Sequence, residues 1–488
     1  MPASFLRLPL SVMSAVLLCA TLGGFAAPAA GAAPPGDKPR LFRAGAATSN
    51  ITPRLGTSIN GHFTDRAATH IHDELHARCL VLDDGQTRLA IVVCDSCMIP
   101  REVMDAAKRR VQEQCGLAPG HILISATHTH TAATCAGVFQ SEPDQPYREF
   151  LVARIADGVA RANNNLAPAR IAWGVGHEPN QVFNRRWKMK PGTIPPNPFG
   201  GTNDLVKMNP PIESPDLLEP AGPIDPEVSV ISVQTPEGRP LALLANYSLH
   251  YVGTGREDAI SADYYGAFAD RIQQLLGADR LDPPFVAALC NGTSGDINNI
   301  NFRQKRAPAG PYEQLRLVAG AVAAEAQRVC QGLQYRDWVP LGVQQTEINL
   351  GVRLPRPEEV ARAETVLAQA NGSALISAEQ VYARETVLIK DYPKQVPLII
   401  QAMRIGDLGI AAIPCEVFAE TGLAIKQQSP FQQTFTIELA NGYNGYLPTP
   451  EQHKLGGYET WRARSSYLET DAAPKILDTV MALFARLR

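Results

Sequence analysis

The sequence has no excess of positive charge. Its 488 residues include 45 Lys and Arg against 48 Asp and Glu, which gives a net charge of −3, and only 7% of the residues are aromatic. The basic residues are scattered along the chain. A protein that binds nucleic acid needs a basic face to neutralise phosphates. We therefore predict no nucleic-acid partner.

The sequence also lacks internal repeats, low-complexity blocks and any Pro/Gly-rich linker of domain-boundary type within residues 41–488. This favours one domain over that range. The exception is residues 188–223, which are rich in Pro, Gly and Asn. Structureless loops of this length are usually functional or mobile, so we interpret these residues as a lid or rim insertion and call them the lid segment.

Long hydrophobic runs are absent except at the N-terminus. There, Arg7 provides positive charge, residues 8–27 form an apolar run, and small residues at 29–33 suit a signal peptidase. Because Pro, Ser, Thr and Gly interrupt the run, cleavage is favoured over a membrane anchor. We predict a signal peptide at residues 1–33, a Pro/Gly-rich tether at 34–40, and export to the periplasm or out of the cell.

Cysteine is sparse, with eight residues left after cleavage of the signal peptide. An exported protein could pair some of them, but the connectivity cannot be read from a sequence. Cys94 and Cys97 form a C-x-x-C, and no second pair exists to complete a zinc ribbon. The default interpretation of these two residues is therefore small, buried apolar side chains.

Strand-like and helix-like segments alternate along the rest of the chain. Short apolar runs such as 77–82 and 88–93 flank tight turns, which is typical of hairpins. Helical spacing of apolar residues marks, among others, residues 147–162, 312–330 and 473–487. Helices combined with many hairpins predict an α/β fold with mixed β-sheets flanked by helices, not a purely doubly wound fold.

The stretch Ser-Ala-Thr-His-Thr-His-Thr at residues 125–131 follows a short apolar strand, residues 122–124. Residues two apart in an extended chain point to the same face, so His128 and His130 could aim both imidazoles at one metal ion. The alternative is a polar cap on a strand end. The pattern is weak alone and gains weight only from the rest of the chain.

Further polar loops follow apolar strands at residues 246–250, 291–298, 413–416 and 441–448. Strand ends are where α/β folds place their sites. Together with the histidine stretch, an ordered set of short motifs resembles the neutral/alkaline (non-lysosomal) ceramidase family, in its N-terminal catalytic domain. The matching stretches are residues 44–53, 71–73, 77–78, 125–131, 184–185, 246–250, 260–266, 295–296, 414–416, 441–446 and 458–459.

The resemblance implies a Zn2+ enzyme of the ceramidase type. Its zinc ligands would be His128, His250, Glu416 and a tyrosine, for which Tyr446 is preferred and Tyr443 is the alternative. Two imidazoles, one carboxylate and a weak phenolic ligand are typical of a catalytic zinc, because they leave room for water or substrate.

The resemblance also implies roles for residues around the metal. His130 and Arg185 would stabilise charge or position the substrate, although Arg185 could instead be a surface residue in a basic run. Asp296, like Asp263, would orient a ligand imidazole or serve as a cap or turn residue.

Asn298 stands where the family carries the serine that is assigned to catalysis. An amide is no nucleophile, but it can donate a hydrogen bond to an oxyanion. Water activated by zinc is therefore the expected nucleophile, since zinc lowers the pKa of bound water to roughly 7. The family also continues into a C-terminal β-sandwich, and we expect this chain to correspond to the catalytic domain alone.

These observations predict an exported zinc-dependent hydrolase of an amide, or else an ester, bond. Its leading substrate is ceramide or another N-acyl lipid of sphingolipid metabolism, and the resemblance leaves room for a peripheral membrane contact. The polar lid segment favours the first alternative, a hydrolase of the same fold that acts on a non-lipid, small-molecule acylated substrate. The second alternative is an exported protein that keeps zinc without turnover, and in the third the histidines bind no metal. The oligomeric state stays open.

Overall fold

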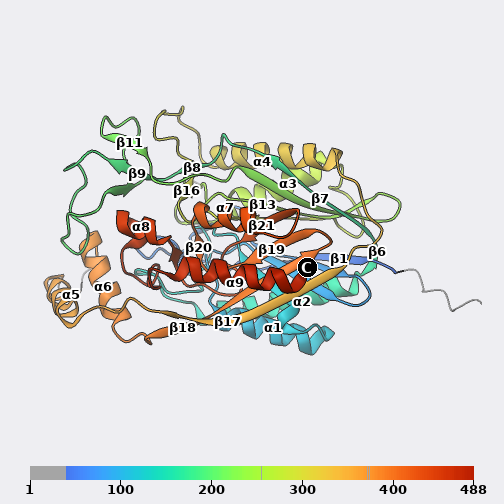
Figure 1. Cartoon of the computed structure of the whole chain (residues 1–488), viewed down its shortest axis with the longest axis horizontal. Helices are drawn as coiled ribbons and strands as arrows, with labels where there is room; N and C mark the ends of the chain where they lie inside the picture. Colours follow the sequence, from blue (N-terminus) through green and yellow to red (C-terminus); the bar gives the residue numbers. More distant parts are fainter. Residues whose placement is uncertain (1–39, 254, 371, 373) are drawn as a thin grey trace, which may run out of the picture. The chain divides into compact units, whose positions relative to one another are not determined.

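Three β-sheets of mixed strand direction surround a common apolar core. The computed structural model describes residues 40–253, 255–370, 372 and 374–488. The predicted signal peptide and nearly all of the tether lie outside the described residues. Figure 1 shows the sheets at the centre, with α3 and α4 above them and α1 below. The predicted α/β fold with mixed sheets and flanking helices is confirmed.

Each of the three sheets joins antiparallel hairpins to one parallel edge strand. In spatial order, the first sheet consists of β5 (Ile122–Ala126), β4 (Arg88–Cys94), β3 (His76–Asp83), β1 (Arg43–Asn50) and β6 (Ala167–Pro168). The second consists of β15 (Val286–Asn291), β13 (Pro240–Tyr247), β12 (Glu227–Gln234) and β7 (Arg170–His177). The third consists of β17 (Leu341–Gly351), β18 (Gln395–Ile405), β19 (Leu408–Ala412) and β21 (Gln433–Ile437).

The strands alternate between two apolar environments, because successive side chains point to opposite faces of a sheet. Leu244 of β13 packs in the central core with Leu82 of the first sheet and Ile410 of the third. Its neighbour Leu243 instead faces the helices outside the second sheet. Near-continuous hydrophobic strands such as β4 therefore mark sheets that are buried on both faces.

A pair of helices packs on the outer face of each sheet. The first sheet carries α1 (Arg101–Cys115) and α2 (Gln145–Asn164), the second α3 (Asp263–Leu275) and α4 (Glu313–Gln331), and the third α7 (Ala419–Gln428) and α9 (Ala472–Leu487). Three further helices lie away from the sheets: α5 (Pro357–Gln369), α6 (Ala378–Ile389) and α8 (Pro450–Leu455). Short 3-10 turns occur at Pro119–His121 and Tyr458–Thr460.

The predicted hairpin between β3 and β4 has a clear local cause. Asp84 Oδ1 accepts the backbone N–H groups of Gln86 and Thr87 at 2.8 and 2.6 Å. Gly85 has a φ of 90°, in the left-handed region that glycine adopts without strain. Asp83 Oδ1 accepts the Gly85 N–H at 2.8 Å, so two aspartates close this turn.

The lid segment differs from the expected structureless loop. It contributes most of a three-stranded antiparallel sheet formed by β9 (Arg186–Met189), β10 (Val206–Met208) and β11 (Leu217–Pro220). The strands are short and separated by prolines and turns, so neither periodicity nor composition revealed them. Backbone pairing nevertheless gives this segment a defined position, shown in Figure 1 at the upper left.

Two-stranded ladders fix the loops that follow the sheets. They pair β2 (His70–Ile71) with β14 (Ala259–Ile260), β8 (Phe183–Asn184) with β16 (Ile297–Asn298), and β20 (Glu416–Val417) with β22 (Tyr446–Leu447). Their effect is to hold residues from distant parts of the chain at one place. In the last ladder, Glu416 lies directly beside Tyr446.

All eight cysteines within the described residues are free thiols, and six of them are buried. Cys94 and Cys97 are both fully buried, as the default interpretation of the C-x-x-C expects. Within the same described ranges, no helix is both long and apolar enough to cross a membrane.

A buried lysine on α1 leads to a prediction about pH. Lys108 is 2% exposed, its ammonium donates to Asn441 Oδ1 at 2.7 Å, and burial lowers its pKa to about 8. The unfolded chain then binds more protons than the folded chain between pH 8 and 10.5, so the free energy of unfolding should rise with pH over that window. Lys108→Met should lack this rise and should be more stable than wild type at pH 7.5, by about 3 kcal/mol at most.

Urea unfolding at pH 7.5, 9 and 10 measures the effect. Asn441 Oδ1 would still accept the Ile124 N–H in the variant, so its oxygen is not left without a donor. Arg109→Met, on the exposed side of the same helix, is the matched control and should leave the pH dependence unchanged. Parallel pH profiles for wild type and Lys108→Met would contradict the prediction.

Candidate functional site

Three loops bring the predicted metal ligands together. His128 follows β5 of the first sheet, His250 follows β13 of the second, and Glu416 follows β19 of the third. All three side chains are at least 98% buried. Each of these strands belongs to a parallel pair, and the carboxyl ends of parallel strands are a usual place for sites. The ligand set is thus assembled from three separate sheets.

The three ligand atoms converge on one point. His128 Nε2 lies 3.1 Å from His250 Nε2 and 3.2 Å from Glu416 Oε2, and His250 Nε2 lies 4.0 Å from the same carboxylate oxygen. Two imidazole nitrogens and one carboxylate oxygen at this separation form a group that can hold a metal ion.

Hydrogen bonds to backbone carbonyls orient both imidazoles. His128 Nδ1 lies 2.8 Å from the Cys97 oxygen, and His250 Nδ1 lies 3.1 Å from the Ser294 oxygen. A carbonyl can only accept, so Nδ1 carries the proton in each ring and Nε2 presents a lone pair. Backbone carbonyls are therefore the partners of both rings, and Asp263 and Asp296 accept backbone N–H groups, as in the cap or turn role that the sequence left open.

The residues present fit a cation. Two facing Nε2 lone pairs cannot hydrogen-bond to each other, and Glu416 Oε2 is buried without a hydrogen-bond partner among the described residues. Burial lowers the pKa of His250 well below 6.5, and the charge of Arg185 adds to this, which keeps the ring neutral as a ligand must be. Burial also opposes charge on His128, but the facing Glu416 carboxylate outweighs it and raises the pKa of His128 well above 6.5, so a positive charge at Nε2, from a proton or from a metal ion, is favoured. The site therefore attracts positive charge.

His130 reaches the same centre by a route that differs from the expected one. Its Nε2 lies 3.2 Å from His128 Nε2. The chain is not extended here, because His128 has a φ of 74° in the left-handed region. A non-glycine residue in that conformation costs about 1–3 kcal/mol and is often found at functional sites. The two imidazoles thus converge through a strained turn and not through strand geometry.

Tyr446 and Tyr443 both reach the centre, by different contacts. Tyr446 is buried, and its hydroxyl accepts a hydrogen bond from Arg185 Nη2 at 3.0 Å. The Tyr443 hydroxyl donates to Glu416 Oε1 at 3.0 Å. The choice of Tyr446 as the fourth ligand therefore stays a prediction, with Tyr443 as its alternative. A third phenol, Tyr458, packs edge-on against Tyr446 with ring centroids 5.9 Å apart.

Arg185 is a buried residue of the site, so the surface alternative is wrong. Its Nε donates to Glu459 Oε1 at 2.8 Å, and its Nη1 lies 3.3 Å from His250 Nε2. Glu459 is fully buried and also binds Arg186, through Oε2 at 2.5 Å. One carboxylate is therefore shared by two adjacent buried arginines, and it fixes the direction of Arg185.

Asp296 and Asn298 lie on the same loop but have different surroundings. Asp296 accepts hydrogen bonds from Asn184 Nδ2 at 2.7 Å and from the Ala419 N–H at 2.9 Å, and burial raises its pKa to about 6. These contacts hold the loop that carries Arg185 against α7. Asn298 faces a cavity instead, and its amide donates to Asn209 Oδ1 at 2.7 Å.

Glu438 holds parts of the site in place and was not predicted from the sequence. Its carboxylate accepts the Ser294 hydroxyl at 2.6 Å and the Val417 N–H at 2.7 Å, and burial raises its pKa to about 8. It thereby joins the loop that orients His250 to the strand that carries Glu416. The signal in the sequence is its position directly after an apolar strand, β21, three residues before the polar loop at residues 441–448.

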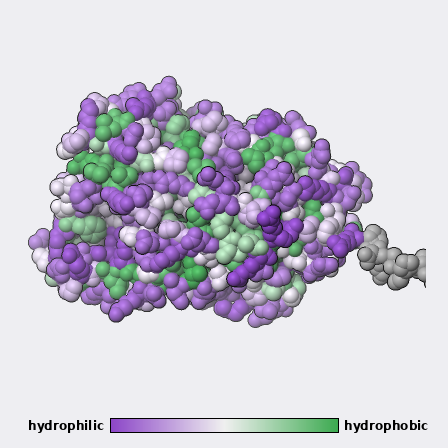
Figure 2. Space-filling view, viewed as in Figure 1, coloured by the Kyte–Doolittle hydropathy of each residue, from purple (hydrophilic) through white to green (hydrophobic). Residues whose placement is uncertain are grey.

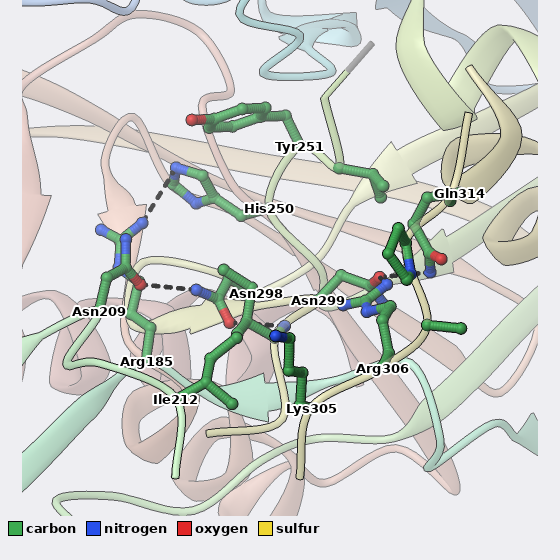
Figure 3. A pocket seen from close by; sticks show the side chains of 15 residues that line it. Arg185, Asn209, Ile212, His250, Tyr251, Asn298, Asn299, Lys305, Arg306 and Gln314 are labelled. Atoms are coloured by element: carbon green, nitrogen blue, oxygen red, sulfur yellow. Dashed lines mark hydrogen bonds between the residues drawn. The ribbon is translucent and has the colours of Figure 1, made fainter. Parts of the chain in front are cut away.

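One cavity is lined by residues of the centre, and a second is linked to it through Tyr458, which packs on Tyr446. The first, of about 440 Å³, is lined by Arg185, His250 and Asn298 together with other polar residues (Figure 3). The second, of about 250 Å³, is mostly apolar. Its lining includes Phe63, Ile194, Pro195, Pro196, Tyr458 and Trp461. The lid segment, although polar in composition, thus contributes apolar side chains to this second cavity.

Comparison with known proteins agrees with this geometry. Residues 42–304, more than half of the chain, match the family model described as neutral/alkaline non-lysosomal ceramidase, N-terminal. Neutral ceramidase A of Dictyostelium discoideum is 23% identical over 266 residues, which cover 51% of this chain and only 33% of that protein. Neutral ceramidase of Pseudomonas aeruginosa is 22% identical over 490 residues, which cover 86% of this chain and 68% of that protein.

Solved structures show the same fold. The crystal structure of neutral ceramidase from Pseudomonas aeruginosa matches with a TM-score of 0.70 and 18% identity, over 92% of this chain and 75% of that chain. A structure described as ceramidase complexed with C2 matches with a TM-score of 0.68 over the same shares. The resemblance seen in the sequence motifs is confirmed, and the chain belongs to the neutral/alkaline non-lysosomal ceramidase family.

Proposed function

We propose that this protein is an exported, zinc-dependent hydrolase that cleaves the amide bond of ceramide or a related N-acyl lipid. The observation that carries the proposal is the convergence of His128, His250 and Glu416, three buried ligands, at the wall of a cavity. Membership of the ceramidase family supports the same reaction class. Either Tyr446 or Tyr443 would complete the ligand set.

A zinc ion held by these ligands would polarise the substrate carbonyl and lower the pKa of a water molecule. The chain's own residues would supply the rest of the chemistry. In the overall reaction the C–N bond breaks, the acyl carbon gains the oxygen of water, and the amine leaves with the proton. The products are a fatty acid and a free amine.

Arg185 is placed to stabilise the negative charge that develops on the carbonyl oxygen. Its guanidinium is held by Glu459 on one side and reaches His250 and Tyr446 on the other. A fixed donor in a water-poor site stabilises such a charge without having to reorganise during the reaction. The Tyr446 hydroxyl, which accepts from Arg185, has its own proton free to donate to the same oxygen.

His130 is placed to move the proton. Burial lowers its pKa well below 6.5, and the neighbouring His128 contributes, so the ring is neutral and can accept a proton at Nε2. That nitrogen faces the ligand cluster at 3.2 Å from His128 Nε2. A neutral imidazole in this position is suited to take a proton from water and pass it to the leaving amine.

Asn298 has a minor role in this scheme, which gives a prediction. Its amide carries no nucleophilic hydroxyl and can offer the substrate only a hydrogen bond, so Asn298→Ala should lower kcat/KM for ceramide by about ten-fold or less, the usual effect of losing one neutral hydrogen bond. Steady-state kinetics beside a circular-dichroism check of folding measure the change. A loss above about a thousand-fold would instead indicate that Asn298 takes part in bond cleavage.

The apolar cavity is suited to the acyl chain. Tyr458 joins it to the centre, because this ring lines the cavity and packs on Tyr446. A peripheral membrane contact is part of the proposal, and exposed apolar side chains of the lid segment support it. Leu205, Ile212 and Leu218 of the lid segment are 43–56% exposed, and Figure 2 shows apolar side chains gathered over the β9–β11 sheet.

The test is turnover of a fluorescent ceramide by the chain without residues 1–33. We expect release of sphingosine and fatty acid, loss of turnover after chelation, and recovery when zinc is added back. Stoichiometric zinc without turnover on ceramide or a panel of other N-acyl amides would favour the non-catalytic zinc protein. Purified protein that binds no metal would favour structural histidines and would overturn the proposal.

A further inference from the structure

The larger cavity beside the metal centre is cationic. Arg185 and His250 form one side of it, and Lys305 and Arg306 line it from the segment between β16 and α4 (Figure 3). Arg306 and Gln314 lie across the cavity from Arg185 and His250 (Figure 3). The other polar groups in the lining are the hydroxyl of Tyr251 and the amides of Asn209, Asn298, Asn299 and Gln314, and no described Asp or Glu lines the cavity.

We propose that the substrate carries a carboxylate on the amine side of its scissile amide, as in an N-acyl amino acid, and that Lys305 and Arg306 bind this carboxylate in the cavity. The inference deepens the proposed amide hydrolysis and rests on it. A guanidinium and an ammonium that share one cavity with hydrogen-bonding amides match a carboxylate in charge and in donor geometry.

The two cations are available for a ligand. Within the described ranges, neither Lys305 nor Arg306 forms an ion pair, whereas Lys188 of the neighbouring lid segment pairs with Glu219 at 2.8 Å. Arg306 Nη1 donates only to a neutral acceptor, Asn299 Oδ1, at 2.7 Å. Partial burial without a counter-charge lowers the pKa of Arg306.

Two acids beside this segment accept backbone N–H groups and do not line the cavity. Glu213 accepts the backbone N–H of Lys305 at 3.3 Å, and Glu313 accepts the Gly310 N–H at 2.8 Å. Neither residue belongs to the lining. Arg185 is paired with Glu459, whereas Lys305 and Arg306 form no ion pair among the described residues, so these two are the unpaired cations of the lining.

Hydrogen bonds hold part of the polar lining of the cavity in place. Asn299 Oδ1 accepts from both Arg306 Nη1 and Gln314 Nε2 at 2.7 Å, and its amide nitrogen donates to the Gln181 carbonyl at 2.7 Å. This network ties the segment with the two cations to α4 and to residues before β8. A binding group held in place loses less entropy when it meets its ligand.

The direction of the substrate follows from the second cavity. The apolar cavity lined by Tyr458 suits an acyl chain, whereas the cationic cavity suits the amine side of the same molecule. Arg185 and Tyr446 connect the two, because Arg185 lines the cationic cavity and donates to Tyr446, which contacts Tyr458. The scissile amide would then lie between them, at the ligand cluster.

The experiment compares two amides with the same acyl chain, N-lauroylglycine and N-lauroylethanolamine. The first ends in a carboxylate where the second ends in a hydroxymethyl group. The zinc-loaded chain should hydrolyse N-lauroylglycine with at least ten-fold higher kcat/KM. In the Lys305→Gln/Arg306→Gln double variant, kcat/KM should fall about ten-fold for N-lauroylglycine and less than two-fold for N-lauroylethanolamine. Arg303→Gln is the control, because Arg303 lies in the same segment but outside the cavity lining. This substitution should leave kcat/KM unchanged for both amides.

A second measurement needs no turnover. Isothermal titration compares N-(dodecylsulfonyl)glycine with N-(dodecylsulfonyl)ethanolamine, two sulfonamides that the reaction cannot cleave. Tighter binding of the glycine compound, lost in the double variant, supports the carboxylate site even if no amide is hydrolysed. Equal binding or equal turnover of the paired compounds overturns the inference. Absence of hydrolysis of ceramide and both amides overturns the proposed function, so the two failures are distinguishable.

Discussion

Replacing His250 with alanine should remove the bound metal and lower amide hydrolysis by more than a hundred-fold. His250 supplies one of the two imidazole nitrogens that lie 3.1 Å apart, and without it the group of His128, His250 and Glu416 keeps only two of its three ligand atoms. Loss of a partner that merely orients a ligand already costs roughly 10- to 100-fold in affinity or activity, so loss of the ligand itself should cost more.

Two measurements check this result independently. Metal content by mass spectrometry should fall from about one zinc per chain towards zero. Ceramide turnover should fall with it, and added zinc should restore turnover poorly. His177→Ala is the control, since His177 is exposed at the end of β7 and only its backbone N–H is used, by Glu325. Full zinc content in His250→Ala would show that the ligand set is wrong.

Replacing Glu459 with alanine should destabilise the fold as strongly as any single substitution in the site. The carboxylate is fully buried between Arg185 and Arg186, at 2.8 and 2.5 Å. Its removal leaves two buried guanidinium groups without their counter-charge, and breaking a buried pair in this way costs about 3–5 kcal/mol. Arg185 would also lose its fixed direction, so we expect kcat to fall in whatever protein remains folded.

Chemical denaturation measures the loss of stability. Burial alone would raise the pKa of Glu459, but the charges of Arg186 and Arg185 hold it below its usual value. The stabilisation is therefore present above the unfolded pKa of 4.5 and is lost as the pH falls below it. Wild type and Glu459→Ala should converge in stability in acid.

The matched control is a substitution in the lid segment. Glu219→Ala removes an acid from an exposed pair with Lys188, where water screens both charges, and should change neither stability nor turnover measurably. Similar losses in Glu219→Ala and Glu459→Ala would mean that burial of the Glu459 pair does not matter. That outcome would contradict the role given to this carboxylate.

The core and the main ligand candidates could be predicted because their signals are local or ordered along the chain. Apolar strands such as β4 and β5 and the helical spacing of α2 show themselves within one short window of residues. The motifs around His128, His250 and Glu416 are each weak, but their order along the chain pointed to the family. The structure places His128 Nε2 3.1 Å from His250 Nε2 and 3.2 Å from Glu416 Oε2.

Other features could not be predicted because they depend on long-range contacts. The strands of the lid segment are short and gain their definition only by pairing with each other. Glu438 carries no motif, and its role follows from the loops that it joins. The Asp263 side chain accepts backbone N–H groups of residues 252, 253 and 264, a turn role that the sequence could not separate from a metal-site role.

By itself, the sequence determined the α/β fold class with its mixed sheets, the family, and the residue types that reach the centre. Periodicity and motif order can be read along the chain, so these features need no information on packing. The tertiary structure alone decided which groups face one another. It assigned backbone carbonyls to the two imidazoles, buried Arg185 beside Glu459, and gathered Lys305 and Arg306 at one cavity without an acid. The physical reason is that charge, burial and lone-pair direction are properties of neighbours in space, and the neighbours here come from three different sheets.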